Sequence, residues 1–162
     1  MDAAASSSPT TTTNAPPAIR AGKSGRAIVC FVTIALLLLL GDLVLKSWAF
    51  ANVAGEPIEL RGTPDVRAAV PWHEPIVIVP KVLSLQLTVN TGAVFGLGKG
   101  AIGFFVFVSI VATVAISVLF ARSSARAWVH HVALAMILAG ALGNLYDRVC
   151  FNAVRDMLHL FP

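Results

Sequence analysis

Two aspartates stand close together in the segment GNLYDRVCFNAVRDMLHLFP, which covers residues 143–162. Two carboxylates that share one proton can hydrolyse a peptide bond, because one activates a water molecule while the other protonates the leaving group. Such carboxylates lie roughly 3 Å apart. Asp147 and Asp156 would lie about 13 Å apart on one continuous helix. They can therefore form such a pair only if the chain folds back sharply between them.

Five further polar residues interrupt or border the apolar parts of the chain: Asp42, Lys46, Asn90, Asn144 and Arg148. Asp42 and Lys46 have the i,i+4 spacing that puts two side chains on one face of a helix. Ionisable groups in or beside a membrane span are costly unless paired, and they commonly mark a functional site. The alternative interpretation is that Asp42 with Lys46, and Asp147 with Arg148, are interface anchors that pair or snorkel.

Three apolar runs must position these residues. The chain is 57% hydrophobic and only 12% charged, whereas globular domains carry about 25% charged residues. Runs at residues 27–50, 101–121 and 127–147 can each cross a hydrocarbon core of about 30 Å at about 1.5 Å per residue. The sequence therefore predicts an all-α membrane protein with three transmembrane helices.

Lysine and arginine predict the orientation of the spans, because cytoplasmic segments beside a span carry an excess of these residues. Arg20, Lys23 and Arg26 precede the first run, and Arg122 and Arg126 flank the link between the second and third. Both segments belong in the cytoplasm, so all seven polar residues are expected at the outer interface. A signal peptide cleaved after the AFA of residues 49–51 is an alternative for the first run. The long polar leader and the charged pair near the end of that run disfavour it.

Two segments outside the spans have distinct compositions. Residues 1–26 are rich in Ser, Thr and Pro and predict a disordered cytoplasmic tail. Residues 51–100 lie outside the cytoplasm, and the alternation in VLSLQLTV predicts a strand or two. We expect a small extracytoplasmic β element between helices 1 and 2.

Composition also excludes several kinds of function. Nucleic-acid binding needs clustered basic residues, and here they are scattered between apolar runs. If the runs span a membrane, Cys30 and Cys150 fall near opposite faces, so they cannot form a disulfide within one chain. His130 and His131 lie far from the polar residues and have no second set of ligands, so we interpret them as interfacial. The sequence predicts no metal site and no cofactor.

The motifs DLVLK, NTGAVFG, GNLYDR and VRD occur in an order and on elements that resemble the lipoprotein signal peptidases (signal peptidase II). These intramembrane aspartic proteases of the bacterial cytoplasmic membrane cut prolipoproteins just before a diacylglyceryl-modified cysteine. The resemblance covers residues 32–162. It implies that Asp156 is the first catalytic aspartate and that six residues form the substrate site: Asp42, Lys46, Asn90, Asn144, Asp147 and Arg148. The implied partners are lipid-modified signal peptides and membrane lipids.

The family pattern places its second catalytic aspartate in an N-x-A-D motif on a fourth span, and nothing in this sequence matches that motif. We therefore expect residues 27–162 to form a peptidase-like domain that is incomplete at its C-terminal end. Two alternatives stay open. One is a catalytically inactive three-span relative that binds lipid-modified peptides, and the other is a structural or transporter-like membrane protein with coincidental motifs.

Overall fold

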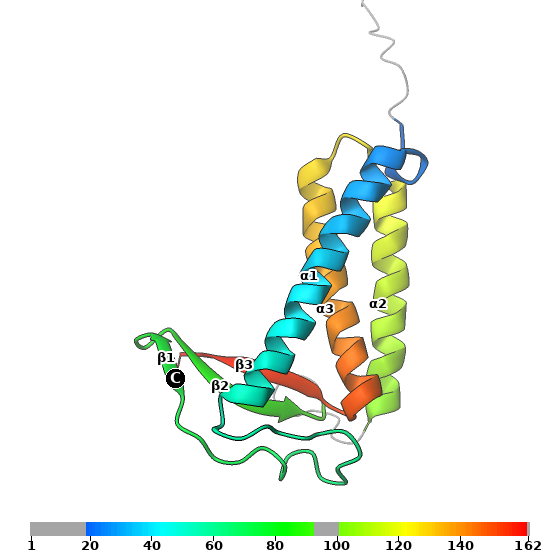
Figure 1. Ribbon diagram of the computed structural model, residues 1–162. Helices are drawn as coiled ribbons and strands as arrows, with labels where there is room; N and C mark the ends of the chain where they lie inside the picture. The colour runs from blue at the N-terminus through cyan, green and yellow to red at the C-terminus, as the bar shows by residue number, and fades with distance from the viewer. Residues whose placement is uncertain (1–18, 93–100, 162) are drawn as a thin grey trace, which may run out of the picture.

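The computed structural model describes residues 19–92 and 101–161 (Figure 1). Its three long helices are α1 (Gly25–Asn52), α2 (Ile102–Arg122) and α3 (Trp128–Phe151). Each is long and apolar enough to cross a membrane, by length and composition. The three predicted spans are thus confirmed. The main difference is that α3 continues past residue 147 to Phe151.

Helix α3 packs against both α1 and α2 and is the most buried of the three. Small side chains line its contact with α1, including the buried Ala35, Ala135 and Ala139. Small residues allow membrane helices to approach closely, because there is little side chain to separate the backbones. At the N-terminal end of α1, the ring of Phe31 stacks on that of Phe120 from α2 with 4.0 Å between centroids. The helices therefore form one packed bundle.

A three-stranded antiparallel sheet lies at one end of the bundle (Figure 1). Strands β1 (Ile76–Val79) and β2 (Leu83–Asn90) confirm the predicted β element between helices 1 and 2. The third strand, β3 (Val154–Leu160), was not predicted and follows α3. The left-handed backbone of Asn152, with φ of 56°, ends α3 and turns the chain back toward the sheet.

A second apolar core joins the sheet to the bundle. It contains Phe50 from the end of α1, Leu60 and Val66 from the following loop, Leu87 from β2 and Met157 from β3. Because these side chains come from four parts of the chain, they fix the sheet against the C-terminal ends of α1 and α3. Three carboxylates and three cations lie around this junction: Asp42, Asp147, Asp156, Lys46, Arg148 and Arg155.

The start of the described chain is ordered against the link between α2 and α3. The backbone N–H of Ala21 donates to Ser123 O over 2.9 Å, and that of Ala125 donates to Ile19 O over 2.8 Å. A short 3₁₀ helix, η1 (Ala21–Lys23), leads from this contact into α1. Residues 1–18 of the predicted tail lie outside the described residues, whereas residues 19–26 are structured. The order arises from backbone pairing, which composition does not reveal.

Candidate functional site

The carboxylate of Asp147 is completely buried in the last turns of α3 and joins three elements. Its Oδ1 lies 3.0 Å from Nε and 2.9 Å from Nη2 of Arg155 on β3. Its Oδ2 lies 3.1 Å from the backbone N of Arg155 and 3.1 Å from Nζ of Lys46 on α1. Both oxygens are therefore fully engaged, and Asp147 ties α1, α3 and β3 together.

The ammonium group of Lys46 lies between two carboxylates. It contacts Oδ2 of Asp42 at 3.0 Å as well as Asp147, and the Lys46 side chain is buried while that of Asp42 is 31% exposed. The pairing of Asp42 with Lys46 that their spacing indicates is thus present. A buried ammonium needs such partners, because removing an unpaired charge from water is expensive.

Arg155 is the central residue that the sequence analysis missed. Its guanidinium lies 4.4 Å from the ring centroid of Phe151 and 5.9 Å from that of Phe50. Its Nη1 also lies 3.4 Å from the hydroxyl of Ser47. Together, Asp42, Lys46, Asp147 and Arg155 form a four-residue charge cluster with two carboxylates and two cations. The cluster has no net charge, which makes its burial tolerable.

Asp156 lies beside this cluster on β3, opposite Thr88 of β2. Burial raises the pKa of its carboxyl above the usual value for aspartate. Lys46 opposes this rise in pKa, Asp147 adds to it, Arg148 opposes it and Asp42 adds to it, in decreasing order of size. Asp156 is thus an additional carboxyl next to a neutral cluster, and it binds a proton more readily than an exposed aspartate does.

The remaining predicted residues border the same region. Asn90 pairs with Val154 across β2 and β3, and its Oδ1 accepts a hydrogen bond of 2.9 Å from the backbone N of Gly92. Arg148 lies over the ring of Phe105 with its guanidinium 5.4 Å from the centroid, and its Nη1 lies 3.4 Å from Asn144 O. The structure therefore brings all seven predicted residues to the junction of bundle and sheet. Residues 93–96 of the NTGAVFG motif lie outside the described residues.

Two expectations about Asp147 are revised by this geometry. The chain does fold back between Asp147 and Asp156, so a helical separation of about 13 Å does not apply. Asp147 nevertheless has both oxygens engaged by Lys46 and Arg155, so it is not free to share a proton with Asp156. Its ion-pair partners are also these two residues, and not its neighbour Arg148 as the anchor interpretation assumed.

Gly143 is a second residue that the sequence analysis did not single out. A Cβ added to it would lie 2.5 Å from Oδ2 of Asp42, the atom that contacts Lys46. The Gly143→Ala substitution should therefore push Asp42 away from Lys46 and lower the free energy of unfolding by about 1–3 kcal/mol, the usual cost of overpacking. Thermal unfolding in detergent or bilayer would measure this loss.

Gly140 provides the matched control for that substitution, since it lies on the same helix and a Cβ added there meets nothing within 4 Å. Gly140→Ala should raise stability by about 0.5–1 kcal/mol, because alanine loses less backbone entropy than glycine in a helix. Equal effects of the two substitutions would show that the contact between Gly143 and Asp42 does not matter.

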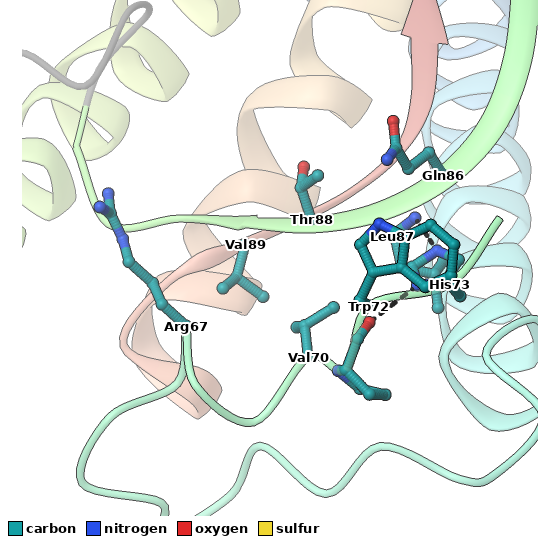
Figure 2. A pocket seen from close by; sticks show the side chains of 9 residues that line it. Arg67, Val70, Trp72, His73, Gln86, Leu87, Thr88 and Val89 are labelled. Atoms are coloured by element: carbon teal, nitrogen blue, oxygen red, sulfur yellow. Dashed lines mark hydrogen bonds between the residues drawn. The ribbon is translucent and has the colours of Figure 1, made fainter. Parts of the chain in front are cut away.

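A cavity of about 340 Å³ lies between β2 and the loop that precedes β1, on the strand that carries Thr88. Figure 2 shows His73 of this loop joined to Leu87 of the sheet by a hydrogen bond. The backbone N–H of Leu87 donates to His73 Nε2 over 2.9 Å, and Nδ1 lies 2.9 Å from Pro71 O. A neutral ring that donates from Nδ1 and accepts at Nε2 satisfies both contacts. The ring thus holds the loop against β2, where the pairing with β3 is irregular between Leu85 and Thr88.

The fold and the site define a multi-pass helical membrane protein with a polar, carboxylate-containing site where the bundle meets a small sheet. The chain belongs to the signal peptidase II family, because the family model described as "Signal peptidase (SPase) II" matches residues 34–162. This match includes all seven predicted site residues and Arg155.

Similar proteins include the lipoprotein signal peptidase of Latilactobacillus sakei, which is 31% identical over 82% of this chain and 77% of the relative. The lipoprotein signal peptidase of Bifidobacterium longum subsp. infantis is 32% identical over 80% of this chain. The chain spans only 61% of the length of that second relative. A solved bacterial membrane enzyme, determined by the in meso method, has the same fold, with a TM-score of 0.64 and 24% identity over 83% of this chain and 76% of that one.

Proposed function

We propose that the protein removes signal peptides from bacterial prolipoproteins by an aspartic endopeptidase mechanism, at the outer face of the cytoplasmic membrane. Its substrates are peptides that carry a diacylglyceryl-modified cysteine. The observation that carries the proposal is the position of Asp156, a partly buried carboxyl with a raised pKa beside a neutral cluster of buried charges. Membership of the signal peptidase II family and relatives named lipoprotein signal peptidase support the choice of substrate.

The charge cluster supports a division of roles among the site residues. Asp156 is the catalytic carboxyl, and the donors of Asn90, Asn144 and Arg148 hold carbonyl and ester oxygens of the substrate. Asp42, Lys46 and Asp147 were expected to bind substrate. Lys46 and Asp147 are buried and paired with one another, and Asp42 is paired with Lys46. We therefore assign these three residues instead to holding β3, and with it Asp156, in place.

The aspartic mechanism needs a second carboxyl, since one group cannot act as base and acid in the same step. Among the described residues, Asp42 and Asp147 are the carboxylates that raise the pKa of Asp156, and both are paired with Lys46. We therefore assign the second acid to a segment outside the described residues, as the family pattern of a fourth span indicates.

The proposal is tested with an extended chain, in which the fourth span of a signal peptidase II relative is fused after Pro162. In a bacterial host that lacks its own peptidase, the extended chain should convert an accumulated prolipoprotein to the mature form, as followed by immunoblot. An extended chain that inserts and folds but leaves the prolipoprotein uncleaved would contradict the proposed activity.

The engagement of both neighbouring carboxylates by Lys46 also favours the second candidate, an inactive relative that binds lipid-modified peptides. The two candidates differ in one result. The inactive relative should bind a lipid-modified signal peptide and leave it uncleaved even after the fourth span is supplied.

Arg148 provides a direct test of substrate binding. Arg148→Ala should weaken the affinity for a diacylglyceryl-modified signal peptide about 10- to 100-fold, because a hydrogen bond to a charged group contributes about 1.5–3 kcal/mol. Tryptophan fluorescence or thermophoresis in detergent would measure the affinity. Arg61→Ala removes an equal charge from an exposed loop position and should leave it nearly unchanged. An unchanged affinity in Arg148→Ala would remove this residue from the binding site.

The proposed orientation places the N-terminus in the cytoplasm and the sheet outside. It rests on the five cations near the start of α1 and the link between α2 and α3. Reporter fusions at Arg26 and Ser124 should show cytoplasmic activity only, whereas a fusion at Val77 should show extracytoplasmic activity only. Extracytoplasmic activity at Ser124 would overturn the topology.

A further inference from the structure

A second cavity, of about 440 Å³, lies at the end of the bundle opposite the sheet. In Figure 1 this end is where η1 and the link between α2 and α3 meet. Ser24, Arg26 and Cys30 line the cavity from the start of α1, and Arg126, Trp128 and His131 line it from the link and the start of α3. It is remote from Asp156 and takes no part in the proposed hydrolysis.

The charged side chains around this cavity are all positive, and no acidic residue lies near them in the sequence. Five cations belong to this end: Arg20, Lys23, Arg26, Arg122 and Arg126. No Asp or Glu occurs in residues 19–41 or 101–146. The next acidic residues along α1 and α3, Asp42 and Asp147, lie in the charge cluster at the other end. Among the described residues none of these cations is paired with a carboxylate, so they are available to an external anion.

Hydrogen bonds between the start of the chain, the link and α3 fix the walls of the cavity. The backbone hydrogen bonds from Ala21 to Ser123 and from Ala125 to Ile19 fix the start of the chain against the link. His131 is 4% exposed and lies 2.9 Å from Ser123 through Nε2 and Oγ, so the start of α3 is held to the same link. Arg26 and Arg126 are exposed on a frame whose backbone is fixed.

The cavity also joins a polar rim to apolar surface. Trp128 is 69% exposed at the start of a membrane span, a place where tryptophan commonly lies at the level of lipid headgroups. Next along the two helices come Ala27, Cys30 and Val132, which face the cavity with little or no polarity. A ligand that matches this surface has an anionic head beside the arginines and an apolar chain beside the helices.

We propose that this cavity binds the phosphodiester headgroup of an anionic phospholipid. The guanidinium groups of Arg26 and Arg126 suit phosphate oxygens because each can offer two parallel N–H donors. Basic cavities between membrane helices are known to hold anionic headgroups, and each cation near an anionic surface contributes about a fivefold gain in affinity. The site is independent of the proposed peptidase activity.

The test measures lipid retention by the purified 162-residue chain in a mild detergent, using native mass spectrometry during titration with phosphatidylglycerol or phosphatidylcholine. Phosphatidylglycerol should bind at least tenfold more tightly than phosphatidylcholine. Arg26→Gln and Arg126→Gln should each weaken its binding about fivefold, and the double variant about 25-fold. Arg122→Gln is the matched control, since this exposed cation belongs to the same end but does not line the cavity. It should change the affinity less than twofold.

Three results would overturn the proposal. Equal affinity for the two lipids would remove the preference for anionic headgroups, and an equal loss in Arg122→Gln would indicate diffuse attraction without a site. If millimolar glycerol 3-phosphate displaced phosphatidylglycerol as strongly as added phosphatidylglycerol does, the cavity would be a site for soluble phosphates. Circular dichroism checks that each variant is folded, and if Arg26→Gln is not, Arg126→Gln decides alone. Prolipoprotein processing by the extended chain should be the same with and without these substitutions, so the two proposals fail separately.

Discussion

Asp156→Asn in the extended chain is expected to lower the rate of prolipoprotein cleavage at least about 10²- to 10⁴-fold, the usual contribution of a positioned acid or base. Asparagine has nearly the shape of aspartate, but it can neither give nor take a proton at neutral pH. The measurement is a cleavage time course at substrate concentrations above KM. A variant that retains more than a tenth of the parent rate would exclude Asp156 as a catalytic group.

Stability distinguishes this catalytic role from a structural one. Burial raises the pKa of Asp156, so the folded state favours its protonated form. The contribution of Asp156 to stability is therefore complete below about pH 4, where aspartate in the unfolded chain is also protonated, and is lost as pH rises through the raised pKa. At pH 7 Asp156→Asn should unfold at a higher temperature than its parent, and the difference should vanish toward pH 4. A lower unfolding temperature at pH 7 would indicate a structural role.

Asp147→Asn is expected to have the opposite effect on stability. It removes the buried charge that pairs with Lys46 and Arg155, so Lys46 keeps only Asp42 as a partner and Arg155 loses its ion pair. Breaking a buried ion pair in this way costs about 3–5 kcal/mol of folding free energy. Chemical or thermal unfolding at pH 7 would measure this loss.

The control for Asp147→Asn is Asp65→Asn, because Asp65 lies in an exposed loop and accepts hydrogen bonds that asparagine can also accept. That control should change stability by no more than about 0.5 kcal/mol. Cleavage by Asp147→Asn in the extended chain should fall in proportion to the loss of folded protein. Normal stability together with lost cleavage would instead assign Asp147 to the chemistry.

The sequence predicted the helices well because a membrane span is a local property. Roughly 20 consecutive apolar residues suffice for a span, and the runs at residues 27–50, 101–121 and 127–147 each meet that length without reference to the rest of the chain. The strand at Leu83–Asn90 was predictable for a similar reason, since its alternation is visible in VLSLQLTV. β3 escaped prediction because its identity as a strand depends on pairing with β2, a contact distant in sequence.

Most residues of the candidate site were predictable from the sequence, but the contacts between them were not. The positions of the span ends sufficed to predict that Asp42, Asp147 and Asp156 lie at the same end of the bundle. Arg155 was overlooked because an arginine beside the VRD aspartate has no distinctive spacing, and its role appears only when β3 returns to α3. Gly143 was overlooked because its small size matters only where Asp42 of another helix approaches it. Both signals exist only in the folded chain.

The most direct measurement of the central claim compares the 162-residue chain with the extended chain on a purified diacylglyceryl-modified signal peptide, with products identified by mass spectrometry. The extended chain should cut the bond just before the modified cysteine, and the 162-residue chain should yield no product above background. Cleavage at that bond by the 162-residue chain would contradict the account, because the second acid would then have to be Asp42 or Asp147, released from its pairing with Lys46.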